Sequence, residues 1–243
     1  MKRQVWIGTS GWMYSHWNKT FYAEADKRDQ LAFYAREFNT VEVNYSFYRI
    51  PDPVSYTKWY ERTPENFRFT VKLNRYLTHL KRLIIDQESK ETLKSFLQDT
   101  QGLKEKLAVI LIQLRPSQGI DIQRLSTFFE AYNEVINHLE FKPSACIEFR
   151  NTTWFSNEIY QLLEKYNVAL VFPSTPQFRQ LVFTSDFAFL RLHGGYSYSD
   201  DDLETLKLEI ENYPSKVRDV FVYFNNDMNT YAIYNARYLR SII

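Results

Sequence analysis

Residues 40–48, Thr-Val-Glu-Val-Asn-Tyr-Ser-Phe-Tyr, carry the pattern that decides the fold. β-Branched and aromatic residues alternate there with polar ones, which predicts a strand. The apolar face of this strand would carry Val41, Val43 and Tyr45. Its opposite face would carry Glu42 and Asn44. One such strand indicates little, but the same layout recurs in later strands and therefore indicates both a fold and a site.

Seven further segments have strand character, and helical periodicity fills most of the connections between them. The strand candidates are 5–10, 40–48, 67–72, 107–114, 145–150, 168–172, 187–193 and 220–224. The helix candidates are 31–38, 54–61, 90–100, 121–138, 157–166, 199–211 and 230–239. Alternating strands and helices predict parallel pairing through crossovers, and eight units in 243 residues match a TIM-type (β/α)8 barrel. We therefore predict an α/β fold with a single barrel domain over residues 1–243. A doubly wound open sheet is the second choice.

The strand faces opposite the apolar ones end in polar groups. In a barrel, one face of each strand packs on helices and the other lines the interior. These interior groups are Glu42, Asn44, Lys72, Gln113, Arg115, Glu148, Arg150, Arg191, His193, Tyr223 and Asn225. They lie toward the C-terminal strand ends, where barrel enzymes keep their active sites. Because burying them without partners is costly, they must pair with one another, with water or with a ligand.

The charged members of this set favour an anion. Glu42 and Glu148 face three cations, Lys72, Arg150 and Arg191, which leaves one positive charge in surplus before His193 is counted. Arginine supplies a planar fork that suits phosphate or carboxylate. The alternative interpretation is that the same residues form an internal ion-pair network and bind no ligand.

Other candidates lie just past the strand ends. Gly194 and Asn226 belong to the loops after the seventh and eighth strands, where barrels often hold phosphate. Ser10 would contact an anion or a backbone turn, and His79 would either reach the site or cap a turn. The predicted wall of the mouth, which would stack on a sugar or a base, comprises Trp12, Tyr48 and Trp154.

Several motifs resemble, in order and over nearly the whole chain, the YecE-like family known as domain of unknown function 72. They are Gly8-Thr9-Ser10-Gly11-Trp12, Thr40-Val41-Glu42-Val43-Asn44 with Phe47-Tyr48, Lys72 with Thr78-His79, Gln113-Leu114 with Pro116, Glu148-Phe149-Arg150 with Trp154, Arg191-Leu192-His193-Gly194 and Tyr223-Phe224-Asn225-Asn226. The resemblance implies a (β/α)8 barrel, similar in fold to the endonuclease IV and xylose isomerase type, and brings no established reaction. Two departures are Pro173-Ser174, where the family pattern has an Asp, and the short segment with Gly195 after His193.

Composition narrows the class of protein. Lys and Arg number 30 and Asp and Glu 29, so the net charge of +1 gives no general attraction to nucleic acid or to an anionic membrane. The one cysteine, Cys146, allows no intramolecular disulfide, which suits a reducing compartment. We find no apolar run of signal length and none near the roughly 20 residues of a membrane span. A cytoplasmic location is therefore expected by default.

Metal ligands are scarce among the interior groups. They include two glutamates, one histidine and no aspartate, which is too few for a multi-zinc centre. We predict no cofactor, and one loosely held divalent cation such as Mg²⁺ remains compatible with the sequence.

These observations predict an enzyme acting on a small anionic, sugar-like substrate that is phosphorylated or carboxylated. Its catalytic candidates are Glu42, Lys72, Glu148, Arg150 and His193, with acid–base chemistry assigned to the glutamates and the histidine. Arg191 would join Lys72 and Arg150 in holding the anion, and Gln113 and Asn225 would orient the substrate. Hydrolase, lyase and isomerase chemistry all stay open, as does the oligomeric state. One alternative is an endonuclease IV-like nucleic-acid phosphodiesterase, which would need a basic groove and bound zinc; the other is a non-catalytic metabolite-binding protein.

Overall fold

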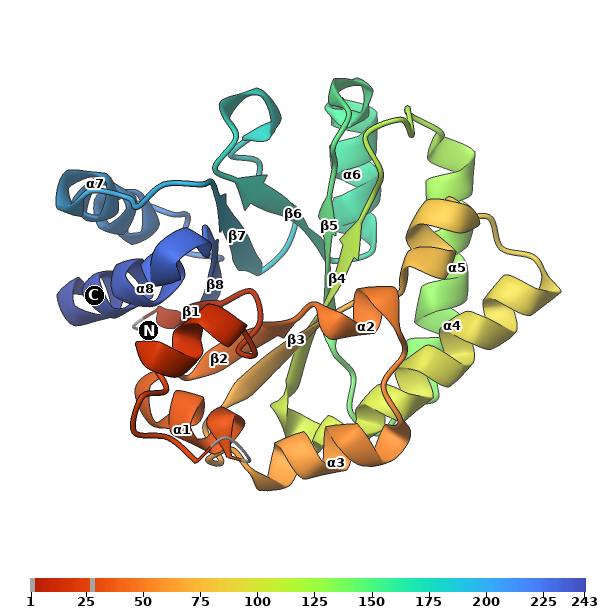
Figure 1. The fold of residues 1–243 in the computed structure, drawn as a ribbon. Coiled ribbons are helices and arrows are strands. Elements are labelled where there is room, and N and C mark those ends of the chain that lie inside the picture. Colours follow the sequence, from red (N-terminus) through yellow and green to blue (C-terminus); the bar gives the residue numbers. More distant parts are fainter. Residues whose placement is uncertain (1–2, 27–28) are drawn as a thin grey trace.

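Eight parallel strands pair side by side in the order β1-β8-β7-β6-β5-β4-β3-β2 (Figure 1). The computed structural model describes residues 3–26 and 29–243, so residues 1, 2, 27 and 28 of the predicted domain lie outside the described residues. The strands are β1 (Gln4–Thr9), β2 (Thr40–Val43), β3 (Arg68–Lys72), β4 (Leu107–Gln113), β5 (Ser144–Glu148), β6 (Val168–Pro173), β7 (Phe187–His193) and β8 (Asp219–Asn225). A bridge between Ser10 and Glu42 joins the two ends of this order. The protein is therefore a TIM-type (β/α)8 barrel, as predicted.

Helices surround the barrel and cover its outer face (Figure 1). They are α1 (Gln30–Glu37), α2 (Tyr45–Tyr48), α3 (Pro53–Glu61), α4 (Gln87–Asp99), α5 (Ile122–Asn137), α6 (Asn157–Lys165), α7 (Asp200–Glu211) and α8 (Tyr231–Ile242). Side-chain caps fix where several begin: Asp52 accepts from the Val54 amide at 2.9 Å, and Ser199 and Asp202 form a capping box. Between β6 and β7 the described chain forms only a 3₁₀ turn, Pro176–Phe178. None of the described helices is long and apolar enough to cross a membrane.

The stretch 40–48 is a strand only as far as Val43, so our placement of Tyr45 on the helix-facing side of a strand was wrong. The backbone of Asn44 is already helical, with φ −85° and ψ −21°. The Ser46 hydroxyl is hydrogen bonded to the Val43 carbonyl at 3.0 Å and to the Lys72 carbonyl at 2.7 Å. These bonds turn the chain over the end of β3 and form the short helix α2. Tyr45 is consequently half exposed.

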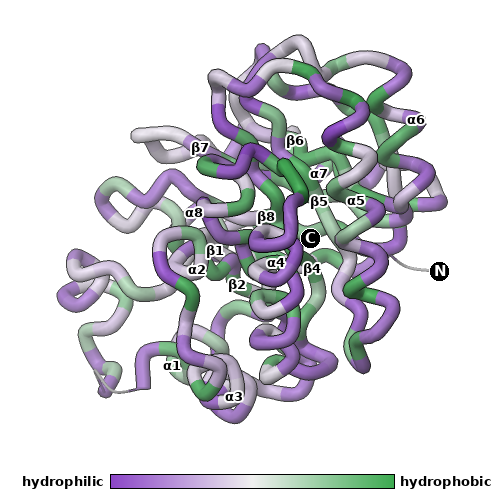
Figure 2. The backbone as a smooth tube through the Cα atoms, turned by 90° about the vertical axis from the view of Figure 1, so that its right-hand side faces the viewer, coloured by the Kyte–Doolittle hydropathy of each residue, from purple (hydrophilic) through white to green (hydrophobic). Residues whose placement is uncertain are grey.

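Apolar side chains form two layers, one on each side of the strands. The outer layer lies between strands and helices and contains the residues assigned there by alternation, such as Val41, Ile147 and Val222. The inner layer fills the barrel and comprises Val109, Leu111, Cys146, Ala169, Val171, Phe187, Phe189, Phe221 and Tyr223. In Figure 2 hydrophobic segments gather toward the central strands and hydrophilic ones toward the outlying loops. The inside–outside alternation predicted for the strands is thus confirmed, and the polar groups occupy the end of the barrel above the inner layer.

Candidate functional site

A cavity of about 880 Å³ opens at the C-terminal ends of the strands. Its lining residues are Gly11, Trp12, Met13 and Tyr14 after β1, Asn44, Tyr45 and Tyr48 after β2, Trp59 on α3, and Lys72, Gln113, Arg150, Arg191, His193 and Asn225 at or after the ends of β3, β4, β5, β7 and β8. Nine of these were predicted as site residues from the sequence: Trp12, Asn44, Tyr48, Lys72, Gln113, Arg150, Arg191, His193 and Asn225. The predicted convergence of polar strand ends therefore occurs in the structure.

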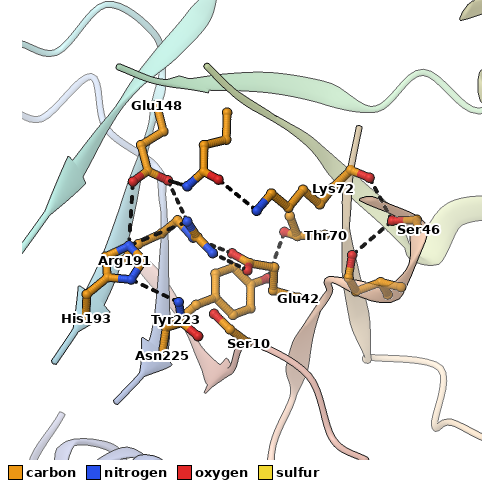
Figure 3. A network of polar contacts seen from close by, with 12 residues as sticks. Ser10, Glu42, Ser46, Thr70, Lys72, Glu148, Arg191, His193, Tyr223 and Asn225 are labelled. Carbon is orange, nitrogen blue, oxygen red and sulfur yellow. Dashed lines mark hydrogen bonds and ion pairs between the residues drawn. The ribbon is translucent and has the colours of Figure 1, made fainter. Parts of the chain in front are cut away.

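Arg191 lies at the centre of the polar groups, between two carboxylates (Figure 3). Its Nε and Nη2 donate to the two oxygens of Glu42 at 2.8 and 2.7 Å, and its Nη1 donates to Oε2 of Glu148 at 2.5 Å. All three side chains are almost fully buried, so the pairing satisfies groups that water does not reach. Arg191 thereby connects β7 to β2 and to β5.

Glu148 is held ionised by its neighbours. Its second oxygen lies 2.5 Å from Nη2 of Arg150. Burial alone would raise the pKa of this carboxyl, but Arg191, His193 and Arg150 outweigh burial and hold the pKa well below its usual range. Neither Glu148 nor Glu42 belongs to the cavity lining. Both carboxylates lie behind the arginines rather than in contact with the space that a ligand would occupy.

Lys72 presents its ammonium to the cavity in a poorly hydrated setting. Its Nζ donates to Oε1 of Gln113 at 2.8 Å and lies 4.2 Å from the centre of the Phe47 ring. Gln113 in turn donates to Glu148 at 2.9 Å, which orients the amide. Burial, followed by the positive charge of Arg191, lowers the pKa of Lys72 to about 8. Lys72 can therefore gain or lose a proton near neutral pH.

His193 is a neutral imidazole between an amide and a guanidinium. Its Nδ1 lies 2.9 Å from Nδ2 of Asn225, and its Nε2 lies 3.0 Å from Nη2 of Arg150. Burial lowers the pKa of His193, a shift that its contact with Glu148 only partly opposes. Ser174 holds the main chain of His193 through bonds to its amide and carbonyl at 2.9 and 3.0 Å. The end of β6, where the chain departs from the family pattern, thus supports the histidine on β7.

Two lining residues present polar atoms without hydrogen-bond partners among the described residues. These atoms are Oδ1 of Asn44 and Nε of Arg150, and each is buried at the atomic level. Oγ of Ser10, directly beneath the first loop, is in the same condition. Because an unsatisfied buried polar atom costs about 1–3 kcal/mol, such atoms beside a cavity are suited to bind a ligand or ordered water.

Aromatic side chains also line the cavity. Trp12 and Trp59 meet edge to face, with ring centres 5.3 Å apart, and Tyr14 donates its hydroxyl proton to the Ser10 carbonyl. Tyr45 and Tyr48 are 53% and 70% exposed at the mouth. We did not predict Tyr14 or Trp59, which lie outside the strand alternation, and we placed Tyr45 on the helix-facing side of a strand.

Four predicted residues lie away from the cavity. Trp154 does not wall the mouth: it is 1% exposed, stacks on Phe149 and donates to the Gln118 carbonyl at 2.7 Å. Tyr223 is buried inside the barrel. Asn226 is also fully buried and donates to the Tyr196 carbonyl and to Asn235. Gly194 serves a turn, because its φ of +146° favours glycine and a Cβ there would lie 2.7 Å from the Tyr196 ring.

His79 lies in a second depression beside the first. Its Nδ1 is 2.9 Å from the Thr78 hydroxyl, and its ring packs edge to face on Phe47. In the part of the chain that the structure describes, no three or more His, Cys, Asp or Glu side chains gather as a metal site would require.

Comparison with known proteins finds a matching family model, a sequence relative and related crystal structures. A family model described as a protein of unknown function, DUF72, matches residues 6–243. The UPF0759 protein YunF of Bacillus subtilis is 25% identical and spans 98% of this chain and 94% of its own. The crystal structure of a DUF72 family protein from Thermotoga maritima is 25% identical, covers 98% of both chains and superposes with a TM-score of 0.81. A DUF72 family protein from Enterococcus faecalis, 20% identical, covers 99% of this chain and 98% of its own with a TM-score of 0.77.

Proposed function

The chain belongs to the DUF72 family of proteins of unknown function, and we propose that this member is an enzyme acting on a small anionic, sugar-like molecule. The observation that carries the proposal is the distribution of charge around the cavity. Both glutamates are paired behind Arg191 and Arg150, whereas the groups that line the cavity itself are these two arginines and Lys72. A ligand therefore meets the positive groups and no carboxylate among the lining residues, which favours phosphate or carboxylate.

The aromatic wall supports a ring-shaped substrate. Trp12, Trp59 and Tyr48 line the cavity together with the charged strand ends. Flat aromatic faces stack on sugar rings and exclude water from them. An anionic group held by the cations would leave the rest of the molecule against this wall.

Lys72 and His193 are the proton-transfer groups that the geometry favours. Both line the cavity, and burial brings the pKa of Lys72 to about 8, so either protonation state is accessible near neutral pH. We accordingly revise the role of Glu42 and Glu148 from acid and base to groups that position Arg191. Glycoside hydrolysis uses a pair of carboxyl groups at the substrate, and the lining residues offer none. The reaction type that these groups favour is proton transfer, with Arg150 and Arg191 stabilising negative charge that develops on the substrate.

A matched ligand screen tests the proposal. Thermal shift would be measured with sugar phosphates, sugar acids and the corresponding uncharged sugars, and ¹H NMR would then follow any bound compound for turnover. We expect stabilisation by anionic members only, its loss in Arg150→Gln, and conversion of at least one of them. Stabilisation by uncharged sugars alone would contradict the anion site. Binding without turnover of any bound compound would contradict catalysis and indicate a metabolite-binding protein.

A further inference from the structure

A second depression, of about 520 Å³, lies next to the main cavity. Its lining residues are Phe47, Arg75, His79, Leu80, Arg115, Pro116 and Ser117, which come from α2, the connection after β3 and the loop after β4. No acidic side chain is among them. Two guanidinium groups and one imidazole are therefore the only ionisable groups that line it.

Neither arginine is neutralised by a carboxylate. Among the described residues, no Asp or Glu is paired with Arg75 or Arg115, whereas Arg150 and Arg191 of the main cavity both have carboxylate partners. Arg115 is partly buried, and its Nη1 donates weakly to the His79 carbonyl at 3.4 Å. Two unpaired guanidinium groups beside one hollow attract an anion, and arginine binds phosphate with paired hydrogen bonds.

One aromatic ring separates the two hollows. Phe47 has the ammonium of Lys72 4.2 Å from its ring centre and the imidazole of His79 at 4.9 Å between ring centres. The pKa of His79 is lowered by burial and then by Lys72, Arg115 and Arg75. The pKa of this imidazole therefore depends on cations in both hollows. Phe47 therefore lies between a cation that lines the main cavity and an imidazole that lines the second depression.

We propose that the depression around Arg75 and Arg115 binds a second anionic group of the same ligand. The substrate class is then a sugar-like molecule with an anionic group at each end, such as a sugar bisphosphate. This inference rests on the proposed function, because it assumes that the first anionic group binds beside Lys72 and Arg150.

Calorimetry with two probes separates the two proposals. Glucose 6-phosphate and glucose 1,6-bisphosphate would be titrated into wild type, Arg75→Gln, Arg115→Gln and the double variant. Arg82→Gln is the matched control, because Arg82 is an exposed arginine of the same connection that lines neither hollow. We expect wild type to bind the bisphosphate about tenfold more tightly, and the double variant to lose that preference while its affinity for the monophosphate stays unchanged. Arg82→Gln should keep the preference.

The pKa of His79 provides a second test, because it would not change on ligand binding if Arg75 and Arg115 had only a structural role. The pKa of His79, assigned with a His79→Gln variant, should rise when the bisphosphate binds and stay constant with the monophosphate. Equal affinity for the two probes would overturn the second subsite and leave the proposed function intact. A preference that survives in the double variant would overturn it too. Failure of both probes to bind would count against the sugar-phosphate site itself, and the second subsite would fail with it.

Discussion

At the scale of single residues, Arg191 determines how the other charged groups behave. A buried guanidinium is tolerated only because two buried carboxylates surround it, one on β2 and one on β5. Glu42 is paired with Arg191, and Glu148 is paired with both Arg191 and Arg150, so neither carboxylate is directed at a ligand. What remains available for chemistry is the positive charge of Lys72 and Arg150 together with the neutral imidazole of His193.

Removing Arg191 should be strongly destabilising. Arg191→Met leaves Glu42 and Glu148 buried with too few positive partners, and we expect the free energy of unfolding at pH 7 to fall by about 3–5 kcal/mol in urea denaturation. The deficit should shrink as the pH falls, because unpaired buried carboxylates take up protons more readily in the folded state than in the unfolded chain. Arg150→Gln, whose side chain is partly exposed, is the control and should cost far less. A similarly small loss for both variants would contradict the pairing.

A triple variant, Glu42→Gln with Glu148→Gln and Arg191→Met, separates charge from packing. Because it removes all three buried charges together, it should recover much of the stability that Arg191→Met loses. No recovery would show that Arg191 matters through its shape rather than through its charge.

Lys72 should make anion binding depend on pH. Because burial lowers its pKa to about 8 from an ordinary 10.5, the ammonium is largely present at pH 7 and lost above pH 8. The dissociation constant of an anionic ligand should therefore increase as the pH rises through 8, and the Lys72→Met variant should bind more weakly without that step. Calorimetry between pH 6 and pH 10 would measure both profiles. Identical profiles for the two proteins would remove Lys72 from the site.

The same pKa shift predicts a trend in stability. Between pH 8 and 10.5 the unfolded chain holds this proton while the folded protein has released it, so this lysine makes the free energy of unfolding rise across that interval. The shift corresponds to about 3 kcal/mol. Other groups also titrate there, so the measured quantity is the difference between wild type and Lys72→Met in urea denaturation at each pH.

At the scale of elements, strands could be predicted well and the segments beyond them poorly. A strand in a closed barrel must alternate between inner and outer faces, so alternation alone identified Lys72, Glu148, Arg191 and their neighbours. That rule ends with the strand. Tyr45 was placed on the wrong side because Asn44 already turns into α2, and Trp59 on α3 has no sequence signal that separates a cavity-facing ring from a core ring.

Trp154 illustrates the opposite error. Its position just past β5 suggested a wall of the mouth, but its indole fills a space under the loop and satisfies the Gln118 carbonyl. Which way a ring turns in such a loop depends on tertiary packing with residues far along the chain, and no local pattern encodes that packing.

Two tryptophan variants test these assignments. Trp154→Phe should lower the free energy of unfolding by about 1–3 kcal/mol, because it leaves the Gln118 carbonyl without its donor, and should leave ligand affinity unchanged. Trp59→Leu should weaken binding of a sugar-like ligand with a smaller effect on stability, because Trp59 lines the cavity. Urea denaturation and calorimetry on both variants give the comparison. Weaker ligand binding in Trp154→Phe, or unchanged ligand binding in Trp59→Leu, would contradict these assignments.

At the scale of the whole molecule, polar contacts connect strands that are distant in the sequence. Arg191 joins β7 to β2 and β5, and the Tyr223 hydroxyl on β8 pairs with Thr40 on β2 at 2.6 Å and Thr70 on β3 at 2.8 Å. Tyr223 belongs to the apolar inner layer, and Arg191 lines the cavity. The base of the site is therefore also part of what holds the barrel together.

Tyr223→Phe should weaken the barrel without altering the site. It removes one buried hydroxyl and leaves the Thr40 and Thr70 hydroxyls with one partner fewer, which we expect to cost about 1–3 kcal/mol in urea denaturation. Ligand affinity should match wild type, because Tyr223 does not line the cavity. A large loss of ligand affinity with unchanged stability would contradict the assignment of Tyr223 to the barrel interior rather than to the ligand site.

The most direct test of the central claim is native mass spectrometry of the protein purified without added ligand, alongside an Arg150→Gln/Lys72→Met variant. The account predicts a co-purified small anion on the wild-type protein, released on denaturation and identifiable by its mass, and absent from the variant. A neutral molecule retained equally by both proteins would contradict the claim that the charges around this cavity select an anion.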